Sequence, residues 1–270
     1  KESIKATKAS KSFGLEIVDK VATQKVLDKS TINYLSIVIH HIAFDGWSVD
    51  VFLIDLQSYY DYYAEEASGN KRAELKLPGL TIQYKDFSVW QRSYLTGEIL
   101  ERQLNYWRNK LSGYETLNLP LDKPRPKQLS YAGADIAFKI DEISSNKLRE
   151  LAKSLHVSMY SLLLSGYYLL LSSYSNQDDI TVGTPIANRH HAQLEDMVGF
   201  FVNSLAVRSQ LDKKQTVVDY IQTTGREIIE AQLHQDLPFE KLVTELNVAQ
   251  DTSRHPIFQV MFSVQSFGRQ

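Results

Sequence analysis

The sequence contains no cysteine. This absence excludes a disulfide framework, a thiolate metal centre and a cysteine nucleophile within the chain. No apolar run approaches the roughly 18 residues that a membrane-spanning helix needs, and the lysine-rich start lacks the apolar core of a secretory signal. The 30 basic and 32 acidic residues form no long run of one sign, so charge gives no reason to expect a nucleic acid partner. We therefore expect a cytoplasmic globular protein that binds neither nucleic acid nor membrane.

The chain is long enough, at 270 residues with 43% apolar content, to bury a substantial core as one domain or as two lobes. Residues 117–133 contain three prolines and show no helical period, which indicates an extended connector. We therefore predict a first lobe over residues 1–116 and a second lobe over residues 134–270.

Hydrophobic periodicity predicts a mixed α/β fold in both halves. Helices are predicted over residues 82–95, 98–111, 144–155, 159–174, 217–233 and 239–246, and strands over residues 135–140, 180–185, 200–207 and 257–264. Gly113 follows the second of these helices and is the expected stop signal for it.

Residues 33–41 show the alternation of a strand, and this strand is predicted to end in His40 and His41. From Ser48 onward the apolar spacing predicts a helix with one buried stripe and with Ser48 as its N-cap. Only a short turn, residues 42–47, separates the two. The expected local architecture is strand, tight turn, helix.

This turn contains the residues whose side chains and amides are the strongest candidates for a catalytic role. Of the two histidines we select His41, because it continues the apolar face of the strand and comes directly before the turn. Asp45 could orient a histidine or could pair with a buried cation that holds the turn. Gly46 accepts positive φ, and its amide could donate to an oxyanion. An exposed strand end and a plain turn explain the same pattern without catalysis, while the lack of a third ligand at helical spacing argues against zinc.

Six segments, taken together and in order, resemble one family. They are HHIAFDGWS (40–48), YKDFSVWQ (84–91), LPLDKPRP (119–126), VGFFVNSLAVR (198–208), HQDLPFEKLV (234–243) and SRHPIFQVMF (253–262). The HHxxxDG pattern and the order of the others resemble the condensation domains of nonribosomal peptide synthetases, a family of the chloramphenicol-acetyltransferase-like superfamily. The resemblance runs from about residue 13 to the end. It implies a central fragment of that two-lobed fold, incomplete at both ends.

The resemblance implies amide formation: the amine of an acceptor aminoacyl thioester attacks a donor acyl thioester. Both substrates would be held on the phosphopantetheine arms of donor and acceptor peptidyl carrier proteins, beside an adenylation domain, so the domain itself would bind no cofactor and no metal. Retention of HHxxxDG disfavours heterocyclisation, and HHIAFDGWS with GFFVNS is most similar to domains that join two L-configured residues. A carrier-binding module without catalysis and an enzyme that acylates a hydroxyl are the alternatives.

The resemblance also assigns roles to numbered positions. His41 corresponds to the second motif histidine, which either deprotonates the amine or orients it. His40 and Asp45 correspond to structural positions, and Asp45 is expected to pair with a downstream arginine, for which Arg189 is the candidate. Gly46 corresponds to a position beside the acceptor site.

Three further residues are candidates for the lining of the substrate channel. Trp47 could also be a packing anchor. Asn203 could instead make a hydrogen bond at the end of a strand. Ser266 stands where many family members carry asparagine after the glutamine of this motif.

Two polar groups outside the turn receive structural interpretations. His190 and His191 lack a following aspartate-glycine turn, and we interpret them as surface residues. His234, Asp236 and Glu240 surround a proline, and we interpret them as residues that cap and solvate the start of a helix.

Overall fold

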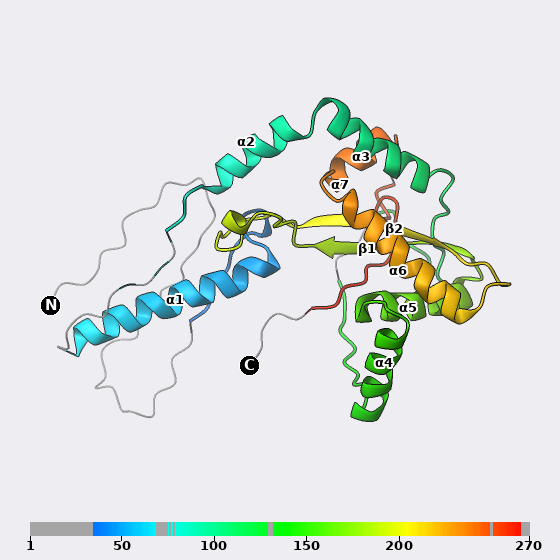
Figure 1. Cartoon of the computed structure of the whole chain (residues 1–270), viewed down its shortest axis with the longest axis horizontal. Coiled ribbons are helices and arrows are strands. Elements are labelled where there is room, and N and C mark those ends of the chain that lie inside the picture. Colours follow the sequence, from blue (N-terminus) through cyan, green and yellow to red (C-terminus); the bar gives the residue numbers. More distant parts are fainter. Residues whose placement is uncertain are drawn as a thin grey trace. The chain divides into compact units, whose positions relative to one another are not determined.

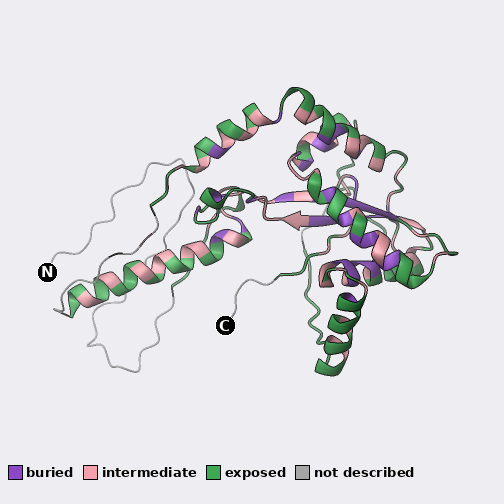
Figure 2. Ribbon diagram, in the orientation of Figure 1, coloured by how far each residue is buried: buried purple, intermediate pink, exposed green. Residues whose placement is uncertain are grey.

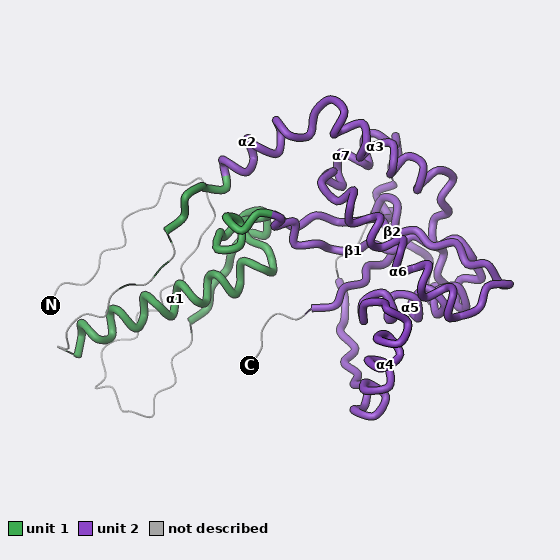
Figure 3. The backbone as a smooth tube through the Cα atoms, viewed as in Figure 1, with its two compact units in different colours: residues 1–84, 191–201 green, residues 85–190, 202–270 purple. Residues whose placement is uncertain are grey.

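The computed structural model describes residues 35–68, 75, 77, 79–128, 132–248 and 251–265. Contacts divide the chain into two compact units, which Figure 3 colours separately. Unit 1 comprises Lys1–Tyr84 and His191–Phe201, and unit 2 comprises Lys85–His190 and Val202–Gln270. The motif turn at residues 40–48 therefore shares unit 1 with a segment from the second half of the sequence.

The main element of unit 1 is the long helix α1, Gly46–Ala67 (Figure 1). Asp45 is its N-cap and accepts a hydrogen bond from the amide of Ser48. The helix therefore begins two residues before the predicted start, and the prediction of Ser48 as the N-cap was wrong. Two single-turn 3₁₀ helices, η1 (His41–Ala43) and η2 (Ala192–Leu194), complete the regular structure described in this unit.

The predicted helices of the remaining chain are all present, with ends that differ from the predicted ones by at most about two residues. They are α2 (Tyr84–Tyr94), α3 (Gly97–Lys110), α4 (Glu142–Ser154), α5 (Met159–Ser175), α6 (Val217–Leu233) and α7 (Phe239–Glu245). Side-chain caps fix three of the starts: Asp141 accepts from the amide of Ser144, Ser158 from the amide of Ser161, and Thr216 from the amide of Asp219. Helix α3 stops where expected, shortly before Gly113, which has φ +63°.

Two antiparallel strands lie at the centre of unit 2. The strand β1, Asp179–Ile186, pairs with β2, Asn203–Gln210, from Asp179 opposite Gln210 to Ile186 opposite Asn203. On its other side β1 meets a single parallel bridge, Gly183 to Met261. Figure 2 shows that buried residues concentrate on these two strands, which explains why both were recognisable as apolar runs.

The core of unit 2 joins the sheet to helices from both sides of the predicted connector. Leu104 and Trp107 of α3 are 1% exposed and belong to the same buried cluster as Leu164 and Tyr168 of α5. The amphipathic α3 thus buries its apolar face against the second half of the chain. For this reason the division between the compact units does not coincide with residues 117–133, and a lobe boundary at that connector stays a prediction.

Arg208 ties the end of α3 to the sheet. Its Nε donates to Asp179 at 2.7 Å, and its terminal nitrogens donate to the carbonyls of Lys110 at 3.0 Å, Ser112 at 2.7 Å and Gly113 at 3.2 Å. The guanidinium therefore satisfies a carboxylate and the carbonyl end of a helix together, which a shorter or uncharged side chain cannot do.

Three predicted strands are not present as strands. Residues 35–40, the described part of the strand predicted over 33–41, are irregular and lead into η1. In the predicted strand 135–140, Ile136 and Phe138 are 89% and 82% exposed, and the predicted strand 257–264 makes only the bridge at Met261. These segments have the alternation of strands but do not form a hydrogen-bonded ladder among the described residues, and alternation alone does not make a strand.

Helices α4 and α5 meet at a bend of 106°. His156 lies in this bend with φ +56°, a left-handed conformation. Within the described part of the chain, no helix by itself has the length and apolar character to cross a bilayer; only the bent pair α4 and α5 together has them.

Candidate active site

The two motif histidines lie on a tight 3₁₀ turn and not at the end of a strand. The carbonyl of His40 accepts from the amide of Ala43 at 3.0 Å, and the carbonyl of His41 accepts from Phe44 at 3.2 Å. His40 also caps this turn, since its Nδ1 accepts from the amide of Ile42 at 3.1 Å. The side chain of His40 thus supports the turn itself.

Asp45 fixes the next part of the turn from a buried position with 3% exposure. Its Oδ1 accepts from the amide of Ser48 at 2.9 Å, and its Oδ2 accepts from the amide of Phe201 at 3.0 Å. Its own amide donates to the carbonyl of Gly199 at 3.1 Å. One carboxylate therefore caps the start of α1 and joins the turn to residues 199–201. The N-terminus of α1 in turn favours the negative charge of this carboxylate.

Ser48 closes this connection from the helix side, and it is fully buried. The amide of Gly199 donates to Ser48 Oγ at 3.0 Å, while the hydroxyl lies 2.7 Å from Asp45 Oδ1 and 3.0 Å from the carbonyl of Gly199. Its single proton serves one of these two acceptors at a time. The turn and residues 199–201 are thus interlocked by short polar contacts.

Tyr84 covers the same segment. Its hydroxyl donates to the carbonyl of Phe200 at 2.7 Å, and its ring packs edge-on against Phe201 at 5.0 Å. A Cβ at Gly199 would lie 2.5 Å from this ring, so only glycine fits there. Burial, and then the nearby Asp45 charge, raise the pKa of the Tyr84 phenol, which therefore remains a hydrogen-bond donor.

His41 is exposed, in contrast to the residues that hold it. Its imidazole lies edge-on against the ring of Phe200, with centroids 5.3 Å apart and an interplanar angle of 89°. The ring thus has an apolar support on one side, and the residue as a whole is exposed. An imidazole placed in this way can form hydrogen bonds with a bound group.

Gly46 and Trp47 begin α1. Gly46 is the exposed first residue of the helix, so the turn predicted over residues 42–47 ends before it, and its amide belongs to the first helical turn, where amides lack an intrahelical acceptor. Trp47 donates from Nε1 to the carbonyl of Glu195 at 2.9 Å. This contact identifies Trp47 as an anchor for the segment that leads to Gly199.

The other predicted site residues belong to unit 2 or lie outside the described residues. Arg189 and Asn203 belong to unit 2, and Arg189 is 9% exposed. Its pairing with Asp45 stays a prediction, as does a channel that contains His41. Ser266 lies outside the described residues.

Asn203 uses its whole carboxamide within unit 2. Its Nδ2 donates to the carbonyls of Gln235 at 2.9 Å and Leu237 at 2.8 Å, and its Oδ1 accepts from the amides of Ser204 at 2.8 Å and Phe239 at 3.0 Å. These contacts favour the strand-terminal hydrogen-bonding alternative over a place in the channel lining.

Comparison with known proteins shows where this arrangement belongs. The condensation domain family matches residues 2–270, essentially the whole chain. The chain belongs to the condensation domain family.

The relatives of this condensation domain are very large synthetases, of which the chain matches one segment. It is 44% identical over 233 residues to N-(5-amino-5-carboxypentanoyl)-L-cysteinyl-D-valine synthase of Amycolatopsis lactamdurans, covering 86% of this chain and 6% of that protein. It is 38% identical over 258 residues to bacitracin synthase 3 of Bacillus licheniformis, covering 95% of this chain and 4% of that protein. The chain thus spans only a small part of the relatives it matches.

Solved structures agree with the assignment. The X-domain in its complex with OxyB from teicoplanin biosynthesis is 29% identical with a TM-score of 0.74, covering 83% of this chain and 50% of that chain. A four-domain nonribosomal peptide synthetase bound to AMP and glycine is 28% identical with a TM-score of 0.72, covering 83% of this chain and 16% of that chain. The mixed α/β fold is therefore that of condensation domains.

Sequence reasoning missed the residues that hold the condensation motif in place. Tyr84 and Gly199 lie within the recognised segments without a predicted role, and Ser48 was predicted only as a helix N-cap. The spacing of Asp45 and Ser48, three residues apart at the start of an apolar period, is the sequence signal of an N-cap and could have identified one contact. The contacts to Gly199 and Tyr84 link distant parts of the chain and leave no local signal.

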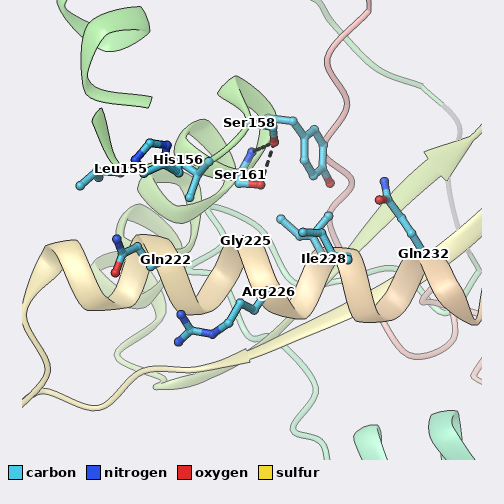
Figure 4. Close-up of a pocket in the computed structure, with 12 residues that line it drawn as sticks. Leu155, His156, Ser158, Ser161, Gln222, Gly225, Arg226, Ile228 and Gln232 are labelled. Atoms are coloured by element: carbon cyan, nitrogen blue, oxygen red, sulfur yellow. Dashed lines mark hydrogen bonds between the residues drawn. The ribbon is translucent and has the colours of Figure 1, made fainter. Parts of the chain in front are cut away.

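Two of the hollows in the described part of unit 2 each have a volume of about 560 Å³. One lies between the bend after α4 and helix α6, with His156, Ser158, Ile228 and Gln232 among its lining residues, and Figure 4 shows Ser158 bonded to Ser161 at its edge. The other is lined by residues near His255. Neither contains a predicted site residue. Among the described residues no group of three or more histidine, aspartate or glutamate side chains could hold a metal ion.

Proposed function

We propose that this condensation domain joins two thioester-bound substrates by an amide bond. The observation that supports this most directly is the geometry of the HHxxxDG turn: His41 is exposed while Asp45 and Ser48, which hold the turn, are buried. Rigid support under an accessible imidazole is the arrangement that proton transfer or amine orientation requires.

In the proposed reaction the acceptor amine attacks the donor acyl carbon. A C–N bond forms, the C–S bond of the donor thioester breaks, the amine loses one proton, and the released thiolate gains one. His41 acts on the amine by accepting that proton or by orienting the lone pair. The amide of Gly46, at the start of α1, is the candidate donor to the oxyanion of the tetrahedral intermediate.

The partners follow from this reaction and from the synthetases that the chain resembles. We propose donor and acceptor peptidyl carrier proteins that present both substrates on phosphopantetheine, an adjoining adenylation domain, and no cofactor bound by the domain itself. The enzyme class is then an amide-forming acyltransferase, and a cytoplasmic location stays a prediction. Because the thiols belong to the carriers, the absence of cysteine from this chain is compatible with thioester chemistry.

The test is His41→Ala in an intact synthetase module, with formation of the dipeptidyl thioester as the measurement. We expect the rate to fall by about 10²–10⁴-fold, the range typical of a lost acid, base or orienting group. His156→Asn is the matched control, because His156 is an exposed histidine of unit 2 with a left-handed φ that asparagine tolerates. An unchanged rate in His41→Ala would remove His41 from the mechanism.

A recruitment module is the second candidate function. It is favoured by one observation, the similarity to an X-domain whose structure was solved in complex with OxyB. Affinity for a carrier protein without turnover of any donor and acceptor pair would support it. Replacement of amine acceptors by alcohols in the same assay separates amide formation from hydroxyl acylation.

A further inference from the structure

His190 and Asp236 face each other in unit 2. The sequence had indicated a surface position for His190 and a place at a helix start for Asp236. His190 Nε2 lies 3.7 Å from Asp236 Oδ1 and 3.1 Å from Asn188 Oδ1. A carboxamide oxygen only accepts, so this ring nitrogen carries a hydrogen. The distance to Asp236 is too long for a hydrogen bond, but it is within reach of an ion pair when the ring is protonated.

Asp236 lies on a loop that is fixed from several sides. The carbonyls on either side of it, at residues 235 and 237, both accept from Asn203. Its Oδ2 lies 3.3 Å from the Tyr94 hydroxyl and 3.4 Å from Gln103 Nε2. Burial, and then the Asp236 charge, raise the pKa of Tyr94, so the phenol remains a donor to this carboxylate.

Gln103 reinforces this arrangement. It is 1% exposed, and its Oε1 is a buried atom without a hydrogen-bond partner among the described residues. The bond from its Nε2 to Asp236 is therefore the polar contact by which this buried amide is held. Helices α2 and α3 together thus present a fixed carboxylate toward the segment that follows β1.

The segment with His190 is less regular. It leaves β1 at Ile186, contains Asn188 with φ +54°, and includes the buried Arg189 directly before His190. Asparagine is one of the residue types that adopt the left-handed conformation most readily, and here it turns the chain directly before Arg189. The His190 and Asp236 side chains are 37% and 24% exposed, so their attraction is screened and adds little to global stability.

We propose that Asp236 is a positioning residue, whose carboxylate holds His190 and, through the shared backbone, sets the position of Arg189, a residue to which the family resemblance assigns a structural role at the site. This inference rests on the proposed function for its catalytic consequence. Asp236 does not touch the reacting atoms in this account. It determines where the segment after β1 lies, and so its loss lowers kcat and leaves KM for the acceptor unchanged.

The experiment compares Asp236→Asn, His190→Gln and the double variant in the full-length protein, with Glu240→Gln as the control. Glu240 is an exposed carboxylate of the same motif in the first turn of α7, so its substitution changes charge without touching the pair. We expect each single variant to lower kcat by about tenfold, because small displacements at a reacting centre are costly. The double variant should show the same tenfold loss, since both substitutions break the same contact between His190 and Asp236.

Two readouts separate this role from a structural one. Asp236→Asn and His190→Gln should leave the thermal midpoint within the range of the control while hydrogen exchange of the amides at residues 187–191 becomes faster. Losses of kcat that multiply in the double variant, or exchange that stays unchanged in Asp236→Asn, would overturn the proposal. If the unmodified protein forms no amide, the proposed function fails, and the exchange measurement still decides whether Asp236 holds the segment.

Discussion

The motif turn of unit 1 and the sheet core of unit 2 are held by different kinds of interaction. In the turn, Asp45 and Ser48 are buried polar residues that bond to the backbone at Gly199 and Phe201. In unit 2, apolar side chains of α3, α5, β1 and β2 form one buried cluster. Hydrogen bonds depend on direction, whereas hydrophobic burial does not. The interactions of the turn therefore mainly fix its conformation, and those of the unit 2 core mainly stabilise the folded state.

This difference predicts that substitutions in the two regions separate stability from activity. The largest effect on stability is expected for Arg208→Met, because Asp179 and three carbonyls lose their common donor. Removal of one partner from a buried ion pair costs about 3–5 kcal/mol of unfolding free energy. Denaturant unfolding followed by circular dichroism measures this loss.

Arg226→Met is the control for that substitution, since Arg226 is exposed on α6. The activity of the Arg208→Met protein that remains folded should be close to that of the unmodified protein. Equal unfolding midpoints for the two variants would show that Arg208 does not hold the unit 2 core.

An intermediate effect on stability is expected for Asp45→Asn. The amide group that replaces Oδ2 or Oδ1 is a donor, and it would face the amide of Phe201 or of Ser48. A buried donor left without a partner costs about 1–3 kcal/mol. Because the turn is displaced as well, the rate of amide formation should fall further than this loss of stability explains.

The comparison for Asp45→Asn is Asp50→Asn, an exposed aspartate of α1. Peptide-bond formation and unfolding are measured on both variants under the same conditions. A stable Asp45→Asn protein with full activity would contradict the view that this carboxylate shapes the turn.

The smallest effect is expected for Tyr84→Phe, which removes one hydrogen bond to the carbonyl of Phe200 and keeps the ring. We expect a loss of about 1 kcal/mol. Since burial and Asp45 raise the pKa of this phenol, its contribution is present below its unfolded value of about 10 and is lost as the pH rises through the raised pKa. Unfolding curves at pH 8 and pH 11 should therefore differ less in Tyr84→Phe than in the unmodified protein, and an equal difference would exclude this role.

Local sequence patterns predicted the helices well. Helix α6 has the predicted bounds Val217–Leu233, because an apolar period and a capping threonine are both local signals. The strand prediction failed over 135–140 and over the described residues 35–40 of the segment 33–41, because a strand also needs a hydrogen-bonding neighbour, which alternation does not specify. Residues 135–140 show this directly, with Ile136 and Phe138 largely exposed.

The candidate site shows the same limit. The ordered motifs identified His41 and Asp45, and the notion that Asp45 holds the turn agrees with its buried contacts. The sequence did not predict that Gly199 and Phe201 receive those contacts, since they lie about 150 residues away in the chain. The assignment of a turn to Gly46 was wrong because the aspartate before it caps a helix and so determines the conformation of the glycine.

The connection between β1 and β2 has a consequence for evolution. It begins and ends at the last residue pair of the ladder, Ile186 opposite Asn203. Between these ends, Gly199 is hydrogen-bonded to Ser48 and Phe201 to Asp45. Chain entropy would tolerate an added residue there, because closure cost grows slowly with length. The hydrogen bonds of residues 195–201 would not tolerate it, so lineages should vary the exposed side chains of this stretch freely while insertions and deletions within it are eliminated.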